Sequence, residues 1–366
     1  MTRMQRRLWC GSILVLVVTG SAWLLQAAQS TPAAGSWRFV VSGDARDCGD
    51  IVMPAIAETA RRNRAAFYWH LGDLRNSYNP DEDIQHQPEH LGAPLALAAY
   101  NAMEWQDFID SQIAPFGSLP YFVGIGNHEI VEPKTREDFV ATFTTWLDAP
   151  VLRSQRRKDT PSDDRVKSYY HWIDRGIAFY FLDNATDDEF DDAQLDWFER
   201  ALTHDTADRS ISTIVAGMHK PLPDGYNTST SMNESPRSAE TGRRVYADLL
   251  KAQRDGHKRV YVLASHQHFY TEDAYDAPYW KDHGGVLPGW VVGTAGALRS
   301  RLPNPSPAVA MTNVYGSLVA TVLPDGEIRF AFQQINEADT PPAVTARYGG
   351  DFVHWCFVNN TTVRAR

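Results

Sequence analysis

The sequence has few cysteines, an excess of acidic over basic residues and no visible internal repeat. Only three of its 366 residues are cysteine, which permits at most one intramolecular disulfide. Lys and Arg number 35 against 45 Asp and Glu, and this formal charge of −10 argues against general binding to nucleic-acid phosphates. The hydrophobic fraction of 43% with 22% charged residues instead suits a globular core, and excludes a disordered chain or a multi-span membrane protein.

The first 28 residues have the pattern of an export signal. Arg3, Arg6 and Arg7 precede an apolar run over 8–28 that ends in small residues suited to cleavage. The pattern predicts a signal peptide over 1–28 and a periplasmic or secreted protein. The alternative is an uncleaved anchor, since the run is long enough to span a bilayer and would hold the protein on a membrane, facing outside the cytoplasm.

Two cysteines remain if residues 1–28 are removed. Cys10 falls within that segment, and a mature chain keeps Cys48 and Cys356. In an oxidising compartment these two can form one disulfide, but they can equally remain free thiols.

Short apolar runs alternate with helical patterns beyond Ser36, which predicts an α/β fold of strands covered by helices. The expected strands are 37–41, 66–71, 121–125, 177–182, 211–216, 260–264, 290–292, 317–322 and 328–332. The expected helices are 54–64, 101–109, 138–147, 191–202 and 238–253. The polar segments 75–99, 150–168 and 221–237 are interpreted as surface loops, and the tail after Asn336 allows one more strand at 352–358.

Metal-ligating side chains recur where these expected strands end, each shortly after a small residue. They are Asp44, Asp73, Asn127 with His128 and Glu129, His219, and His266 with His268. The carboxyl ends of strands in an α/β sheet form the crevice in which ligands bind, so these residues are expected to converge. Carboxylate, amide and imidazole ligands without cysteine indicate Zn, Fe, Mn or a similar ion. Glu129 is expected to orient its loop rather than to bind metal.

The order Asp, Gly-Asp, Gly-Asn-His-Glu, His and His-x-His resembles the calcineurin-like metallophosphoesterase superfamily over residues 37–335. The segments 168–176, 179–183 and 194–198 resemble the middle part of that family, where a strand pair leads to a helix with a Gln-Leu-x-Trp pattern. The resemblance implies an α/β four-layer sandwich of two mixed β-sheets flanked by helices. It places the catalytic domain at 36–335 and leaves 336–366 as a C-terminal tail.

The same resemblance implies a dinuclear centre of divalent or trivalent ions, with Fe, Zn or Mn as candidates. Asp73 would bridge the ions, with Asp44 and His268 at the first and Asn127, His219 and His266 at the second. A metal-bound hydroxide would attack phosphorus in a small phosphate ester, while His128 protonates the leaving oxygen or stabilises the transition state. The expected protein is an exported metal-dependent phosphoric ester hydrolase, with a phosphomonoesterase favoured over a phosphodiesterase.

Two positions depart from the family pattern at the first ion. Arg46 replaces the usual histidine two residues after Asp44, and Asn76 stands where the purple acid phosphatase branch has a tyrosine. Water or a loop residue such as Tyr78 or Asp47 would then complete the site. Arg46 is expected near Asp44 and the substrate phosphate, where it would grip phosphate oxygens and leave the first metal site weak or empty. A non-catalytic, metal-stabilised binding scaffold is the alternative function.

Overall fold

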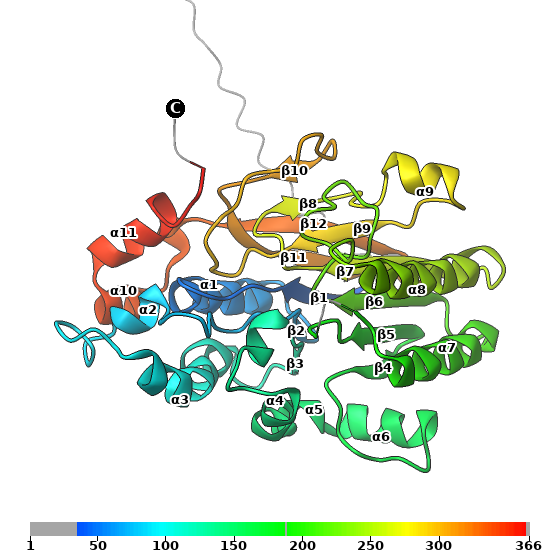
Figure 1. Ribbon diagram of the computed structural model, residues 1–366, viewed down its shortest axis with the longest axis horizontal. Helices are drawn as coiled ribbons and strands as arrows, with labels where there is room; N and C mark the ends of the chain where they lie inside the picture. Colours follow the sequence, from blue (N-terminus) through cyan, green and yellow to red (C-terminus); the bar gives the residue numbers. More distant parts are fainter. Residues whose placement is uncertain (1–34, 187–188, 364–366) are drawn as a thin grey trace, which may run out of the picture. The chain divides into compact units, whose positions relative to one another are not determined.

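Two mixed β-sheets form the centre of the computed structural model, which describes residues 35–186 and 189–363 (Figure 1). The predicted signal peptide or anchor at 1–28 lies outside the described residues. Among the helices that are described, none combines the length and the apolar character that a bilayer crossing requires.

The five-stranded sheet supplies three parallel strands that end at one edge. Its spatial order is β12 (Ile328–Ile335), β11 (Tyr315–Val322), β1 (Trp37–Ser42), β2 (Tyr68–His70) and β3 (Tyr121–Val123). β1, β2 and β3 run parallel, whereas β11 pairs antiparallel with β1. The expected hairpin of the last two strands is present, with β11 and β12 paired over their full length.

The seven-stranded sheet has the same arrangement of parallel strands at its centre. Its spatial order is β10 (Ala310–Met311), β8 (Tyr270–Thr271), β9 (Gly289–Val292), β7 (Arg259–Ala264), β6 (Thr213–Met218), β5 (Ile177–Leu182) and β4 (Tyr170–Asp174). β5, β6, β7 and β9 are parallel, and the short strands at the edges are antiparallel.

Aromatic rings from both sheets fill the space between them. Phe122 of β3 stacks on Trp172 of β4 with 4.1 Å between ring centroids, and Phe39 of β1 meets Phe179 of β5 edge-on at 5.4 Å. Such ring pairs contribute about 0.5–1.5 kcal/mol each beyond the area they bury. Because side chains alternate along a strand, Tyr180 next to Phe179 faces the other way and contacts a helix instead.

Helices cover the outer faces of both sheets. α7 (Asp192–Ala207) and α8 (Pro236–Arg254) lie side by side against the seven-stranded sheet, while α1 (Gly49–Arg62) packs on β11 and β12 (Figure 1). Side-chain oxygens at their N-caps start α7 and α8, with Asp191 accepting from Gln194 N at 2.7 Å and Ser235 from Ser238 N at 3.0 Å. The predicted four-layer α/β sandwich is confirmed.

The remaining helices lie in connections and in the C-terminal segment. They are α2 (Glu82–Gln85), α3 (Leu97–Phe108), η1 (Ile109–Ile113), η2 (Ala114–Phe116), η3 (Asn127–Ile130), α4 (Arg136–Thr142), α5 (Thr144–Leu147), α6 (Pro150–Asp159), α9 (Pro278–Asp282), η4 (Glu337–Asp339), α10 (Pro342–Tyr348) and α11 (Gly350–Val358).

Three expectations about the connections were wrong. The strand expected at 352–358 is helix α11, because Phe352, Val353 and Cys356 lie on one helical face and are buried. Residues 150–159 form helix α6 rather than a loop. The segment 75–99 is not a surface loop throughout, since Arg75 and several of its acidic residues are fully buried.

A disulfide joins Cys48 to Cys356, which answers the question that the two cysteines left open. The bond ties the start of α1 to α11 across 308 residues of chain, and both sulfur-bearing side chains are buried. The C-terminal segment is therefore fastened to the loop that follows β1.

Candidate metal centre

The six side chains expected to bind metal lie together where the parallel strands of both sheets end. In chain order they are Asp44 after β1, Asp73 after β2, Asn127 after β3, His219 after β6, and His266 and His268 after β7. Asp44, Asp73 and His266 adopt left-handed backbone conformations, with φ of 60°, 57° and 66°. Such strained conformations persist where the surrounding structure enforces them, and they are concentrated at functional sites.

Asp73 presents one carboxylate oxygen to each half of the centre. Its Oδ1 accepts a hydrogen bond from the His128 amide at 3.1 Å and lies 3.2 Å from His219 Nε2. Its buried Oδ2 accepts no hydrogen bond from any described residue and lies 3.7 Å from Arg46 Nε. Glu129 holds the loop by accepting hydrogen bonds from the amides of Asp73 and Gly126, at 2.9 and 2.7 Å, which matches its expected orienting role.

Asp73, Asn127, His219 and His266 form what we call the second donor set. His219 Nε2 lies 3.2 Å from Asn127 Oδ1 and 3.0 Å from His266 Nδ1. His219 Nδ1 lies 3.0 Å from the Leu71 carbonyl, to which its N–H donates, so the Nε2 lone pair points at the other donors. Ligand atoms held about 2.1 Å from one ion lie ~3 Å apart, so this spacing fits a bound metal ion.

Asp44, Asp73 and His268 form the first donor set, whose ligand atoms lie within 4.8 Å of one another. Asp44 Oδ1 is buried without a hydrogen bond to the described chain and lies 3.2 Å from His268 Nε2. His268 Nδ1 lies 2.8 Å from the Leu298 carbonyl, so its N–H donates there and the Nε2 lone pair points inward. The donor atoms by themselves therefore suit a second ion.

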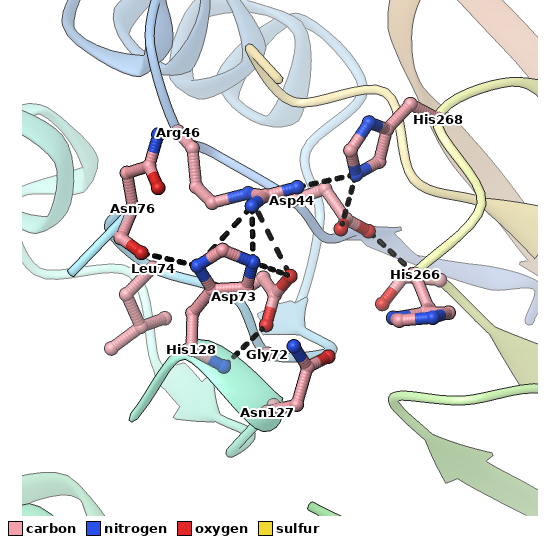
Figure 2. A network of polar contacts seen from close by, with 12 residues as sticks. Asp44, Arg46, Gly72, Asp73, Leu74, Asn76, Asn127, His128, His266 and His268 are labelled. Atoms are coloured by element: carbon pink, nitrogen blue, oxygen red, sulfur yellow. Dashed lines mark hydrogen bonds and ion pairs between the residues drawn. The ribbon is translucent and has the colours of Figure 1, made fainter. Parts of the chain in front are cut away.

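The side chain of Arg46 enters the first donor set (Figure 2). Its Nη2 donates to His268 Nε2 at 2.6 Å, and its Nη1 lies against the ring of His128. His128 Nδ1 contacts the Asn76 carbonyl, so its N–H donates there and the Nε2 lone pair accepts from Arg46. Burial alone would lower the pKa of Arg46, but the nearby carboxylates, Asp73 foremost, raise it above its ordinary value, so the group stays charged.

Neither residue proposed to complete the first site takes an evident ligand position. Asp47 accepts hydrogen bonds from Leu298 N at 3.1 Å and from Asn76 Nδ2 at 3.4 Å, so both of its oxygens are engaged. Tyr78 stands edge-on to the His128 ring at 5.1 Å and is half exposed. Arg46 is thus the residue that fills this side of the centre.

Nearby charges and burial shift the pKa values of Asp73 and Glu129 in opposite directions. Burial would raise the pKa of Asp73, but His128, His219 and Arg46 together hold it well below its ordinary value. Burial, reinforced by the charge of Asp73, raises the pKa of Glu129 to about 8. Asp73 is therefore the ionised acid of the pair, as a metal-binding carboxylate would have to be.

Sequence reasoning missed the role of Ser265 in the second donor set. Its Oγ lies 3.0 Å from His219 Nδ1 and donates to the Leu71 carbonyl at 3.0 Å, which fixes the imidazole. The signal was present as the serine that replaces the glycine usual before His-x-His. At position 126, by contrast, a side chain is excluded, because a Cβ there would lie 2.3 Å from Asp73 Oδ1.

No family model and no curated protein sequence matches the chain. Among solved structures, it is similar to a purple acid phosphatase from yellow lupin (Lupinus luteus), with a TM-score of 0.56 and 17% identity, covering 83% of this chain and 52% of that one. A dimetal phosphatase from Danio rerio has a TM-score of 0.51 and 13% identity, covering 81% and 95%. PhoD has a TM-score of 0.50 and 17% identity, covering 83% and 70%.

These likenesses establish a shared fold, the one that the sequence motifs imply. The chain spans about half the length of the lupin enzyme it matches. At 13–17% identity these likenesses concern the fold alone, so the residues of this chain carry the argument about chemistry.

Proposed function

We propose that the protein is a metal-dependent phosphoric ester hydrolase. The observation that carries the proposal is the convergence of lone-pair donors from Asp73, Asn127, His219 and His266, three of them within 3.0–3.2 Å of His219 Nε2. In the described chain, no guanidinium donates a hydrogen bond to any of these four side chains. The fold shared with two proteins described as phosphatases supports the same reaction class.

When bound, an ion supplies Lewis acidity that withdraws charge from a phosphate oxygen and makes a water molecule acidic enough to attack phosphorus. Fe, Zn and Mn suit this set of carboxylate, amide and imidazole donors. The protein's own residues orient the reaction. Asp73 positions the loop that bears His128 by accepting its amide proton at 3.1 Å, and Arg46 offers N–H groups to non-bridging oxygens. Burial lowers the pKa of His128 to about 4 and its Nε2 accepts from Arg46, so it would stabilise the leaving oxygen through the guanidinium that it orients rather than protonate it.

A phosphomonoester is the favoured substrate. A monoester dianion has one more negative charge and one more non-bridging oxygen than a diester, and the centre offers a charged guanidinium beside the metal ligands to receive them. A phosphodiester is the alternative substrate. A non-catalytic scaffold is the alternative function, because Arg46 has entered one of the two donor sets.

Export is part of the proposal. The buried Cys48–Cys356 disulfide supports it, because such bonds form and persist in oxidising compartments. The mature chain would begin near Ala28 or Gln29, and mass spectrometry of the periplasmic or extracellular fraction tests this. An intact 1–28 segment found in membranes would favour the anchor instead.

The central experiment pairs elemental analysis with hydrolysis of 4-nitrophenyl phosphate and bis(4-nitrophenyl) phosphate. Asp73→Ala and Asn127→Ala should each abolish hydrolysis and lower bound metal, since each removes a donor from the second donor set. Asp196→Ala is the matched control, an exposed acid of α7 whose loss should change neither quantity. Normal metal content and turnover in both site variants would refute the assignment, and full metal content without turnover on any ester would favour the scaffold.

A further inference from the structure

The two donor sets differ in whether a side chain of the protein already uses their lone pairs. In the first donor set, the His268 N–H donates to the Leu298 carbonyl at 2.8 Å, which leaves Nε2 as the only lone pair free for an ion. Arg46 Nη2 donates to that Nε2 at 2.6 Å. A guanidinium has no lone pair to offer a metal, so this contact competes with an ion rather than assisting one.

The other atoms of the guanidinium extend across the same space (Figure 2). Arg46 Nε lies 3.7 Å from Asp73 Oδ2, the oxygen that faces the first donor set, and Nη1 contacts the His128 ring. The side chain is only 11% exposed, so it is not free to swing into solvent without leaving these partners. A divalent ion placed among the same three donors would meet a fixed positive charge at short range.

Among the described residues, no guanidinium enters the second donor set as Arg46 enters the first. His219 Nε2 lies 3.0–3.2 Å from Asp73 Oδ1, Asn127 Oδ1 and His266 Nδ1, and each of these atoms has a lone pair to offer a metal. The residues present thus fit an ion at the second donor set, and they do not fit one at the first.

We infer that this centre holds a single metal ion, at the second donor set, and that Arg46 is a fixed cation of the protein that takes the place of the first ion. Its N–H groups then supply positive charge and hydrogen bonds to a phosphate. They would replace the electrostatic stabilisation that a metal ion gives to phosphate oxygens, but not its coordinate bonds. The ion count stands by itself, whereas the contact with phosphate rests on the proposed function.

The ion count is tested on the full mature protein. Metal is removed with a chelator, Zn²⁺ or Mn²⁺ is restored in excess, and unbound metal is removed before elemental analysis. The wild type should retain one ion per chain, and Arg46→His, which supplies an imidazole in place of the guanidinium, should retain two. Bound Mn²⁺ should give an uncoupled electron paramagnetic resonance spectrum in the wild type and a spin-coupled spectrum in Arg46→His.

Arg136→His is the matched control, because Arg136 pairs with Asp183 through its Nε at 2.6 Å, outside both donor sets. It should retain one ion. Two tightly bound ions in the wild type would overturn the inference, and so would a single ion in a folded Arg46→His protein. If Arg46→His fails to fold, the wild-type count still decides.

Inorganic phosphate tests the second part by calorimetry on the metal-loaded protein. Arg46→Met should weaken phosphate binding at least tenfold when both proteins are loaded with one equivalent of metal, and unchanged phosphate affinity would show that Arg46 does not face the substrate. One ion per chain without hydrolysis of any phosphate ester would keep the ion count and refute the proposed function. Two ions per chain together with hydrolysis would refute the ion count and keep the proposed function.

Discussion

Arg46 and Arg75 are both buried in loops at the carboxyl end of the five-stranded sheet, but their guanidinium groups have opposite surroundings. Arg46 donates hydrogen bonds to imidazole nitrogens of His128 and His268. Arg75 is fully buried among four carboxylates, those of Asp50 at 2.7 Å, Asp83 at 3.0 Å, Asp81 at 3.7 Å and Asp107 in direct contact.

The difference separates a structural charge from a functional one. The carboxylates around Arg75 come from α1, α3, α2 and the loop before α2, so the cluster fastens those segments to one another. Its charge is fully matched by its neighbours, and none of it is left for a ligand. Arg46 faces lone pairs that metal ligands use, so its charge is directed into the crevice. We expect changes around Arg46 to alter chemistry and changes around Arg75 to alter stability.

His128→Ala should produce the largest effect and test the functional side of this comparison. Loss of the partner that orients Arg46 should lower kcat roughly 10² to 10³-fold, with metal retained because His128 belongs to neither donor set. Steady-state kinetics and elemental analysis measure both. His204→Ala, on the outer helix α7, is the control and should leave kcat unchanged. Metal loss on the first change would make His128 a ligand.

Arg75→Met should test the structural side. Removing the guanidinium leaves several buried carboxylates unpaired, and breaking such a buried cluster costs about 3–5 kcal/mol of unfolding free energy. Arg46→Met is the matched change and should cost less than about 1 kcal/mol in the metal-loaded protein. Urea unfolding followed by tryptophan fluorescence compares the two. Equal losses of unfolding free energy in the two variants would show that Arg75 is no more important for stability than Arg46.

Cys356→Ala should change the surroundings of both arginines little and should lower the stability of the whole fold. Cys48 lies in the chain between Arg46 and Asp50, the partner of Arg75, and its disulfide fastens that loop to α11. Loss of the bond should lower the unfolding free energy by about 2–4 kcal/mol while the ion count stays at one. A reductant should lower the melting temperature of the wild type but not of the variant. A lower ion count would show that the disulfide also shapes the metal ligands.

Asp81→Asn should have the smallest effect and sharpen the account of the Arg75 cluster. Burial, opposed by Arg75, raises the pKa of Asp81 to about 7. The folded protein therefore holds a proton that the unfolded chain releases near pH 4, so this stabilisation is present below about pH 4 and is lost as pH rises towards 7. Asp83 and Asp107 also have raised pKa values, so the variant should flatten the pH dependence only in part, by about 2 kcal/mol between pH 5 and pH 7. An unchanged profile in urea unfolding would place the titrating proton elsewhere.

The alternation of strands with helices and the convergence of the candidate ligands could be predicted because both depend on local patterns, whereas the division into two sheets was implied only by the family resemblance. An apolar run followed by a small residue and then Asp, Asn or His marks the end of a buried strand, and parallel strand ends necessarily meet at one edge. Asp44, Asp73 and His219 were placed by that rule alone. Helix α8 was similarly predictable, because its apolar periodicity and the Ser235-Pro236 start are local signals.

Other features could not be predicted because their cause lies far along the chain. The segment at 75–99 is polar and has the composition of a surface loop, yet Arg75 is buried because carboxylates from three segments compensate its charge. The apolar run at 352–358 suits a strand as well as a helix by composition. It is a helix here, with Cys356 and Phe352 both buried one turn apart and the disulfide to Cys48 holding that face inward.

Arg46 depends on both the local sequence and the tertiary structure. The sequence by itself determined that a guanidinium stands where an imidazole ligand is usual, two residues after Asp44. Only the tertiary structure decided its direction, because a long side chain has many rotamers and its partners lie elsewhere: His128 is 82 residues further along the chain and His268 is 222 residues further. The fold brings those two lone pairs together, and they hold the guanidinium inside the first donor set rather than in solvent.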